Sequence, residues 1–466
     1  MTLSTIPTTH DELRAQLAGR LVTPADADYE ALQAVFYGGD RRPSAVARVA
    51  NAEDIAAVIG FARATGTELA VRGGGHSGAG HSTTDGGIVI DTRDLKRIEV
   101  DAEARTAWAD AGLTAAEVNA EVAKHGLVIG FGDTGSVGIA GITLGGGVGY
   151  LVRKFGLTID NVEAVELVTA DGELVTADAE HHPDLFWALR GGGGNFGVAT
   201  RFRYRLHELP QITGGMLVLP ATAETVAAFM AAAEGAPEEL SAIVNVMTCP
   251  PLPFVPEEHH GSIVIFALMC YAGEADAGEA AMAPFRAVAE PLGDLVRPMT
   301  YPELFPAEEA PPADESADPS MVPGFAALTL FTDRIGPEES ALIVERLGWS
   351  DAPMRVAQLR VLGGAMARVA PDATAFAHRQ QRVMVNVAAM YAGPTDRVVK
   401  EAWVRDLASA LSRGNGAAYV NFVNDEGPDR VRAAYPGATW DRLAAVKARY
   451  DPENVFRRNH NIAPAG

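Results

Sequence analysis

The chain has 466 residues, 48% of them hydrophobic and 21% charged, a composition typical of a folded globular protein and not of a disordered one. Its length exceeds what one hydrophobic core usually serves, so we expect two domains. Its 60 acidic residues outnumber the 38 basic ones, and the net charge of -22 argues against nucleic acid or anionic membranes as partners.

The N-terminal segment and the cysteines indicate a compartment. The first residues lack a basic stretch followed by an apolar core, so they do not resemble a signal peptide. No apolar run reaches the ~20 residues that a membrane span needs. The two cysteines, Cys249 and Cys270, show neither metal-ligand spacing nor a disulfide framework. We therefore predict a cytoplasmic protein with two buried thiols and no metal site.

Residues 1–210 combine glycine clusters with helix and strand patterns. Apolar residues recur with helical periodicity over 52–64 and 114–124. Runs rich in apolar and β-branched residues predict strands at 68–72, 87–91, 162–169 and 198–206. Glycines cluster at 73–75, 145–147 and 191–194.

Residues 211–410 have few glycines and alternate strand patterns with helix patterns. Strands are predicted at 241–247, 262–270, 325–331 and 383–391, and helices at 222–234, 277–289 and 337–346. The stretch 302–323 is rich in proline and acidic residues, which favours an exposed loop, with a lid over a site as the alternative. In the last segment we predict a helix at 438–449 and then an ordered end, because aromatic, asparagine and proline residues are interleaved there.

Three segments match the pattern G-x-G-x-x-G of dinucleotide-binding loops, residues 73–78, 130–135 and 192–197. In a Rossmann fold a helix follows this loop and its N-terminus faces the pyrophosphate. The first and third segments lead towards predicted strands, and the residues after Gly135 are so rich in glycine that we expect no helix there. We therefore predict loops that hold a pyrophosphate through backbone N–H groups, with a nicotinamide-binding Rossmann domain as the alternative.

The first of these loops, VRGGGHSGAG at 71–80, contains one histidine among its glycines. The glycines and Arg72 suit a bound phosphate, because bare backbone N–H groups can approach it closely. The imidazole of His76 is the one side chain of this stretch that can act as a nucleophile. From the residues alone, a hydrogen bond to a phosphate and a covalent bond are both open for His76.

Four motifs stand in order along the chain: VRGGGHS, GIAGITLGGGVGYLVRKFGLTIDNV, DLFWALRGGGGNFGVAT and YDPENVFRRNHNI. With them the chain resembles the vanillyl-alcohol-oxidase-type FAD-linked oxidases, in the berberine-bridge-enzyme-like branch with its small bacterial members. The resemblance implies an α+β fold with a PCMH-type FAD-binding domain and a substrate domain made of an antiparallel sheet backed by helices. It implies an FAD-binding domain at 1–210, a substrate domain at 211–410, and a segment at 411–466 that returns to the FAD-binding domain.

The resemblance also implies a role for His76. In the family, the histidine of this motif is bonded to the 8α-methyl carbon of FAD. The flavin methyl group can lose a proton to give an electrophile, to which a neutral imidazole nitrogen adds. Many relatives form a second bond from a cysteine to the flavin 6-position. Thr134 stands at that place here and cannot form the thioether, so a single covalent link is predicted.

Further residues are implied to hold FAD. Backbone and loop groups would bind the pyrophosphate and the ring at Arg72, Gly73, Gly74, Gly75, Ser77, Gly138, Gly141 and Ile142. The rest of the flavin site would be lined by the backbone of Val198 and by Asn421, Asn459 and Asn461. His81 would orient loop or flavin groups, with a plain surface histidine as the alternative. Val137, a small side chain where the family leaves a route for O2, indicates an oxidase, with an ordinary packing valine as the alternative.

The tyrosines that several relatives use as general bases are missing. The tail motif Y-x-N-Y reads YVNF here and ends in Phe422, and the position after the triple glycine is Val148. Tyr391 and Tyr150 are the remaining candidates for a catalytic base, with packing roles as the alternative. A neutral amine can give up a hydride without a base, whereas an alcohol generally needs its proton removed. Either the substrate needs no base, or another group serves.

Together these features predict an FAD-dependent oxidase. A hydride would pass from a substrate C–H next to nitrogen or oxygen to flavin N5, and O2 would reoxidise the flavin to give hydrogen peroxide. The partners are then a small-molecule substrate and O2. A dehydrogenase with another electron acceptor and a flavoprotein that sequesters a small aromatic ligand are the alternatives. No feature of the sequence indicates the substrate or the oligomeric state.

Overall fold

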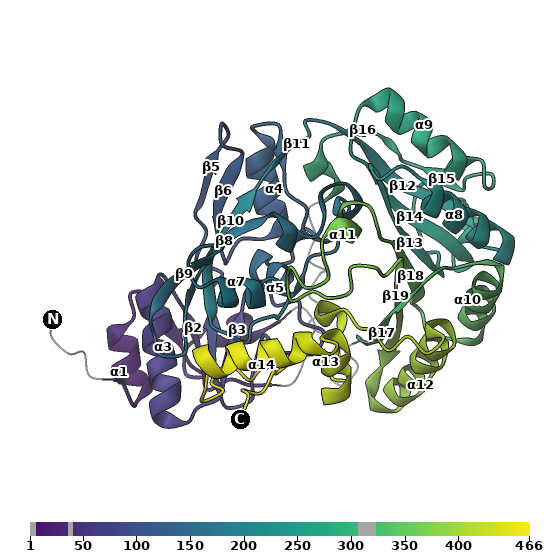
Figure 1. The fold of residues 1–466 in the computed structure, drawn as a ribbon. Coiled ribbons are helices and arrows are strands. Elements are labelled where there is room, and N and C mark those ends of the chain that lie inside the picture. The colour runs from purple at the N-terminus through teal and green to yellow at the C-terminus, as the bar shows by residue number, and fades with distance from the viewer. Residues whose placement is uncertain (1–5, 36–40, 306–322) are drawn as a thin grey trace.

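Two halves lie side by side in the computed structural model (Figure 1), which describes residues 6–35, 41–305 and 323–466. One contains two sheets and the glycine clusters, and we call it the glycine-loop half. The other, the large-sheet half, contains one large sheet with helices on its outer face. The predicted α+β fold is thereby confirmed. Most of the stretch predicted as a loop at 302–323 lies outside the described residues.

The first sheet of the glycine-loop half lies near the N-terminus. Its strands, in spatial order, are β1 (Arg20–Val22), β2 (Ala45–Arg48), β4 (Ile88–Asp91) and β3 (Leu69–Arg72). Its helices are α1 (His10–Gln16), α2 (Tyr29–Gln33) and α3 (Ala52–Thr65). α3 begins where the Asn51 side chain accepts a hydrogen bond from the Asp54 N–H, and it ends before Gly66, which has a φ of 70°. β2 and β3 pair in parallel with β4, so the first glycine loop starts at the edge where β3 ends.

The second sheet of this half is antiparallel. Its strands, in spatial order, are β5 (Ile98–Asp101), β6 (Thr106–Asp110), β10 (Val198–Arg205), β8 (Val162–Val168) and β9 (Leu174–Asp178). The helices near it are α4 (Ala115–Ala123), α5 (Ile139–Gly145), α6 (Val152–Phe155) and α7 (Pro183–Leu189). β7 (Leu127–Val128) and β11 (His207–Glu208) form a short ribbon. Apolar side chains from α4, α7 and the sheet share one buried core.

The large sheet is antiparallel and has eight strands. They are β12 (Ile212–Pro220), β13 (Leu240–Thr248), β14 (Ile263–Tyr271), β15 (Gly293–Asp294), β16 (Arg297–Met299), β17 (Pro323–Thr332), β18 (Arg355–Val361) and β19 (Val383–Ala392). The path across the sheet runs β15-β12-β14-β13-β18-β19-β17, and β16 pairs with β12. The predicted antiparallel sheet is confirmed.

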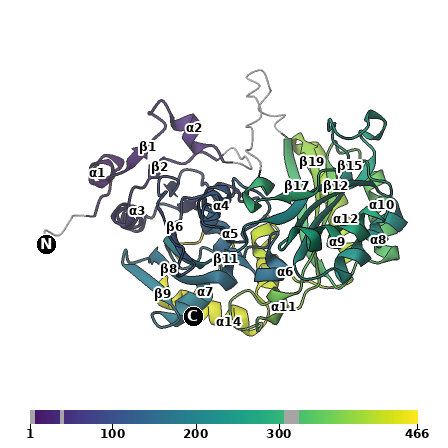
Figure 2. The ribbon, with the colours of Figure 1, turned by 90° about the horizontal axis from the view of Figure 1, so that it is seen from above.

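Helices cover the outer face of the large sheet (Figure 2). They are α8 (Ala223–Gly235), α9 (Ala275–Arg286), α10 (Pro337–Trp349) and α12 (Gly393–Ser412), and the short α11 (Ala365–Arg368) lies near α6. On β18, Ala357, Leu359 and Val361 are buried in the core shared with these helices. Because side chains alternate along a strand, Gln358 and Arg360 face the other way, towards the glycine-loop half.

The C-terminal tail returns to the glycine-loop half, where α13 (Pro428–Ala434) and α14 (Ala438–Tyr450) lie (Figure 1). The fully buried Lys447 of α14 donates hydrogen bonds to the backbone oxygens of Asn195 at 2.7 Å and Phe456 at 2.9 Å, and it pairs with Asp451. These contacts fix the last residues against the third glycine cluster. The ordered end and the helix predicted at 438–449 are confirmed.

Two local predictions are wrong or incomplete. The glycine-rich residues after Gly135 form the helix α5, where we expected none. It is short, its first residue Ile139 is buried, and the Ile139 N–H donates to the Leu113 carbonyl at 2.9 Å, so tertiary packing outweighs the low helix propensity of its glycines. The 20-residue helix α12 was not predicted at all. Cys249 and Cys270 are buried and free, as expected.

Candidate active site

The first and second glycine loops meet backbone to backbone. A Cβ added at Gly74 would lie 2.3 Å from the backbone nitrogen of Gly138, and a Cβ at Gly138 would lie 2.3 Å from that of Gly74. No side chain fits at either position without moving backbone. Gly75 turns the chain with a φ of 79°, in the left-handed region that favours glycine. The close approach of the two loops therefore depends on glycine itself.

His76 lies at this junction. Its Nε2 is 3.1 Å from the hydroxyl oxygen of Ser136, which belongs to the second loop. The Ser77 hydroxyl binds within the first loop, where it accepts a hydrogen bond from the backbone N–H of His81 at 3.2 Å. The first loop thus directs its imidazole to the second loop, where a hydroxyl group holds the ring.

The third glycine cluster joins α5 to the C-terminal tail. The N–H groups of Gly191 and Gly193 both donate to the carbonyl of Leu144, each at 3.0 Å. Asn195 then donates from its side chain to the backbone oxygen of His460 at 3.2 Å and accepts the N–H of Ile462 at 3.0 Å. Three glycine clusters and the tail are connected in this way.

Several buried polar atoms at this meeting point have no hydrogen-bond partner among the described residues. They are both ring nitrogens of His81 and the side-chain oxygens of Asn459 and Asn461. The His81 and His460 rings lie edge to face with centroids 4.7 Å apart. Burial lowers the pKa of His81 to about 3 and that of His460 to about 4, so both rings are neutral at physiological pH.

This arrangement fits a flavin dinucleotide. Buried polar groups are almost always paired, so a ring of unpaired ones indicates a polar ligand. Gly141 has open space around the position of a Cβ, and the first loop offers backbone without side chains, which suits a pyrophosphate. The residues present in the loops and the tail therefore fit FAD.

The buried Tyr419 side chain is hydrogen-bonded to the triple glycine at 145–147. Its hydroxyl accepts the N–H of Gly147 at 2.9 Å and the side-chain N–H of Asn421 at 2.9 Å, and Asn421 also donates to the carbonyl of Ile142 at 3.0 Å. A Cβ at Gly145 would lie 1.9 Å from the Asn421 side-chain oxygen. Burial raises the pKa of Tyr419, which keeps the phenol protonated. The sequence analysis predicted Asn421 as a flavin-lining residue, which stays a prediction, but it gave no role to Tyr419.

The terminal N–H groups of Arg72 are bonded inside the protein. The guanidinium is 1% exposed and pairs with Asp91 at 3.0 Å. The remaining terminal N–H groups donate to the backbone oxygens of Leu32, Gln33 and Ala34. These bonds hold the C-terminal end of α2 against the first sheet. The buried Nε of Arg72 has no partner among the described residues, so a contact between Arg72 and a phosphate stays a prediction.

The two tyrosines predicted as candidate bases are placed differently. Tyr391 packs against the helix-covered core of the large sheet, on the face opposite to the glycine loops, so its prediction as a base is wrong. Tyr150 lies 2% exposed in a small core with Phe305, beside Asp133 and Arg360. Burial, and next the charge of Asp133, raise the pKa of Tyr150. A phenol in that state is a poor proton acceptor.

The remaining predicted positions lie where the loops require them, and their contacts to a flavin stay predictions. Thr134 and Val137 are half-buried in the second loop, and the Val137 carbonyl accepts the N–H of Ala115 at 2.9 Å. Val198 begins β10, and its side chain is 1% exposed in the core of the first sheet. Gly73 has Ala111 and Ala140 as its nearest neighbours, at 3.8 and 4.0 Å.

Sequence reasoning missed one ion pair at the boundary between the halves. Asp133 of the second loop accepts a hydrogen bond from Arg360 of β18 at 2.6 Å. The signal was present, because Gln358 and Arg360 are polar residues two positions apart, with apolar residues on both sides of each. Such a pattern indicates a strand with one polar face.

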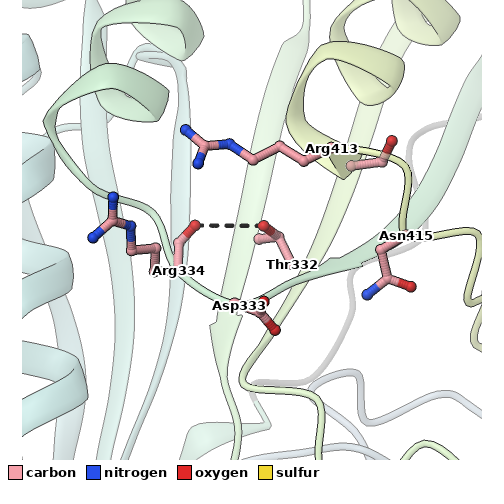
Figure 3. Close-up of a pocket in the computed structure, with 6 residues that line it drawn as sticks. Thr332, Asp333, Arg334, Arg413 and Asn415 are labelled. Atoms are coloured by element: carbon pink, nitrogen blue, oxygen red, sulfur yellow. Dashed lines mark hydrogen bonds between the residues drawn. The ribbon is translucent and has the colours of Figure 1, made fainter.

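A separate hollow lies at the ends of β17 and α12 (Figure 3) and shares no residue with the loops. It is lined by Thr332, Asp333, Arg334, Ser412, Arg413 and Asn415. Arg413 is already paired with Glu338 at 3.2 Å. Among the described residues, no group of three or more metal-ligating side chains is found, and no helix is long and apolar enough to cross a membrane.

Comparisons with known proteins agree with this geometry. The family model for FAD binding domains matches residues 43–178, and that for berberine and berberine-like proteins matches residues 418–463. (R)-6-hydroxynicotine oxidase of Paenarthrobacter nicotinovorans is 29% identical over 461 residues, which cover 97% of this chain and 98% of that protein. The first match contains the first two glycine loops, and the second contains Tyr419 and the tail asparagines.

Solved structures are similar over nearly the whole chain. The crystal structure of 6-hydroxy-D-nicotine oxidase from Arthrobacter nicotinovorans has a TM-score of 0.83 at 27% identity and covers 99% of this chain and 100% of that one. The Physcomitrella patens berberine-bridge-like protein 1 shares the fold, with a TM-score of 0.84 at 24% identity over 98% of this chain and 99% of that one. Fold and site define an FAD-linked oxidoreductase with a PCMH-type FAD-binding domain. Within that class, residues 418–463 match the family of berberine and berberine-like proteins, and the chain is similar over nearly its whole length to (R)-6-hydroxynicotine oxidase.

Proposed function

We propose that this enzyme is an oxidase that binds FAD through a single covalent bond to His76. The observation that carries the proposal is the position of the His76 ring, 3.1 Å from Ser136 at the junction of two loops that only glycine can bring together. An imidazole held there by a neutral hydroxyl group can remain the nucleophile that flavin attachment requires. Thr134, without a thiol, supports one link and not two.

Bound FAD would accept a hydride from a substrate C–H next to nitrogen or oxygen and pass the electrons to O2, giving hydrogen peroxide. The protein would hold the cofactor with loop backbone, with Asn459 and Asn461, and with the loop that Tyr419 and Asn421 brace. Val137 in the second loop supports the oxidase, because a small side chain leaves room for O2. The (R)-6-hydroxynicotine oxidase relative is named as an oxidase of a small molecule, and we infer a small-molecule substrate here.

We also propose that residues 1–210 and 411–466 form the FAD-binding domain and that 211–410 form the substrate domain. The contacts between the tail and the third glycine cluster support this division. We place the protein in the cytoplasm, on the sequence grounds given above.

Acid precipitation of the purified protein tests the covalent bond. We expect the yellow colour to stay in the pellet of the wild type and to move to the supernatant in His76→Ala. His125→Ala, which changes an exposed histidine outside the glycine loops, is the matched control and should keep the colour in the pellet. Colour that is released from the wild type would end the covalent proposal.

The acceptor is tested by mixing the photoreduced enzyme with air-saturated buffer in a stopped-flow instrument. An oxidase should regain its flavin absorbance within seconds and release one hydrogen peroxide per flavin. Reoxidation over many minutes, together with fast reoxidation by an added quinone, would favour the dehydrogenase instead.

A further inference from the structure

The ion pair between Asp133 and Arg360 crosses the boundary between the two halves. Asp133 lies in the second loop, next to Thr134, and Arg360 lies on the face of β18 that points to the glycine-loop half. Their side chains are 20% and 5% exposed, and their charged atoms are 2.6 Å apart. A pair so little exposed is screened weakly by solvent, so its charges act strongly on any group beside it.

Arg360 reaches both positions at which several relatives carry tyrosine bases. Its Nη1 donates to the backbone oxygen of Val148 at 3.0 Å, and its guanidinium carbon lies 5.2 Å from the centroid of the Phe422 ring. Where two phenols are missing, the structure therefore contains a guanidinium and the carboxylate bound to it.

Arg360 is held in one orientation by a chain of hydrogen bonds across the sheet. It donates twice to the Gln358 oxygen, at 3.0 and 2.8 Å. Gln358 donates to the Asn245 oxygen at 2.9 Å, and Asn245 donates to the Phe266 carbonyl at 3.1 Å. Each amide is oriented by the next, so the guanidinium is fixed before any substrate arrives.

The pair keeps one acceptor and one donor unused. Asp133 binds Arg360 through Oδ2, and within the described part of the chain its Oδ1 accepts no hydrogen bond. Arginine has five N–H groups, and four of those of Arg360 are bonded to Val148, Asp133 and Gln358, which leaves one on Nη1 without a partner among the described residues. One free acceptor and one free donor on two side chains that are bonded to each other can complement a hydroxyl group, which donates one hydrogen bond and accepts another.

We propose that Asp133 accepts the proton of a substrate hydroxyl group while Arg360 holds the oxygen, so that this chain oxidises alcohols in preference to amines. The inference rests on the proposed function, because it needs a flavin beside the second loop. The guanidinium charge favours an oxygen that becomes negative as its proton leaves, and it disfavours an ammonium group at the same place.

The step balances without a further reactant. The O–H bond breaks and its proton goes to Asp133 Oδ1, while the C–H bond of the same carbon breaks and its electron pair leaves with the hydrogen as a hydride. A carbonyl group forms on the substrate, and FAD takes up the hydride as in the proposed function. Asp133 returns the proton to solvent through its exposed edge.

Matched alcohols and amines test the proposal in the wild type. Benzyl alcohol against benzylamine, cyclohexanol against cyclohexylamine, and glucose as a hemiacetal would be mixed with the enzyme without air while flavin absorbance is followed. We expect at least one of the alcohols or glucose to bleach the flavin faster than any amine. Bleaching by amines only, or by no hydroxyl compound, overturns the inference. A covalent flavin that amines alone reduce would leave the proposed function intact.

Asp133→Asn tests the residue itself, since the amide keeps an acceptor for Arg360 but takes up no proton. We expect alcohol reduction to slow by about 10²- to 10⁴-fold, the usual contribution of a general base, with flavin content unchanged. Glu238→Gln, which breaks an exposed pair with Arg368, is the control and should keep the wild-type rate. A rate within threefold of wild type in Asp133→Asn overturns the inference.

Chemical rescue distinguishes proton acceptance by Asp133 from a purely structural role. Asp133→Ala leaves space for a small carboxylate, so added formate should raise its rate of alcohol reduction in proportion to the formate concentration. A rate that formate does not change, in a variant that still binds flavin, contradicts proton acceptance. If neither variant folds, the relative rates at which alcohols and amines reduce the wild-type flavin still test the inference.

Discussion

In the glycine-loop half the site is built from backbone, whereas in the large-sheet half it is built from side chains. At the loops, glycines at 74 and 138 let two backbones approach within a distance that no Cβ allows. On β18, in contrast, Gln358 and Arg360 lie on one face of a strand whose other face is apolar core. Glycine at a close backbone contact leaves a sequence motif, whereas a single polar side chain on a strand does not, and in our proposals the first holds the cofactor and the second selects the substrate.

The largest effect is expected from a methyl group at the loop junction. Gly74→Ala would place a Cβ against the Gly138 backbone, so we expect loss of most bound flavin and a fall of ~1–3 kcal/mol in the free energy of unfolding, the usual cost of overpacking. Flavin absorbance per chain and urea unfolding measure both. The control in the large-sheet half is Gly348→Ala, where a Cβ meets open space and α10 should gain up to ~1 kcal/mol. Equal effects in the two variants would contradict the claim that the loop junction, unlike α10, requires glycine.

Removal of the Tyr419 hydroxyl comes next. Tyr419→Phe leaves the N–H groups of Gly147 and Asn421 without their acceptor, and one buried unsatisfied group costs about 1–3 kcal/mol. We expect a lower midpoint of thermal unfolding and weaker retention of flavin in His76→Ala, where the cofactor is not covalently bound. Tyr301→Phe is the matched control, because the buried Tyr301 hydroxyl has no partner among the described residues. Stability that falls equally in both variants would refute the role of Tyr419.

The buried histidine pair gives a pH effect. Burial lowers the folded-state pKa of His81 to about 3, below the unfolded value of 6.5, so the unfolded chain binds more protons between those values. Stability from this group is complete above pH 6.5 and is lost as the pH falls towards 3. We expect the fall in melting temperature from pH 6.5 to pH 4 to be smaller in His81→Phe than in the wild type. In the control His125→Phe, the fall should equal that of the wild type. A wild-type melting temperature that stays flat over this range would count against a buried neutral His81.

The smallest effect is expected at Tyr391. Its ring belongs to the helix-covered core, and Arg397 lies 6.0 Å from the ring centroid. Tyr391→Phe should change the rate of flavin reduction less than twofold and stability by less than about 0.5 kcal/mol. A loss comparable to that of Asp133→Asn would show that the outer face of the sheet takes part in the chemistry.

The backbone-built half could be predicted from the sequence to a large extent. Close backbone contacts tolerate no side chain, so they require glycines, and these form motifs that can be recognised in the sequence. His76 and the tail asparagines lie within or beside such motifs. The sequence does not show that Asp91 and three backbone oxygens bind the terminal N–H groups of Arg72, since these partners are far from it along the chain. The helix α5 was missed because burial of Ile139 outweighs the low helix propensity of its neighbours.

The side-chain-built half could be predicted only as a class of fold. The strands β13, β14, β17 and β19 were predicted, whereas β12 and β18 were not. The face on which a residue lies depends on register, and a shift of one residue decides whether Tyr391 faces the glycine loops or the helices. The ion pair of Asp133 and Arg360 joins residues far apart in sequence, so the pattern of β18 can indicate a polar face but not the partner that Arg360 binds. The helix α12 could have been found, since Lys400, Val404, Leu407 and Leu411 recur with helical spacing.

The mass of the tryptic peptide that runs from Gly73 to Arg93 shows whether the flavin is bonded to His76, because this peptide contains both His76 and His81. We predict that it carries the mass of one flavin and that fragmentation places the flavin on His76. A peptide with the mass of its amino acids alone, or with the flavin on His81, would contradict this prediction.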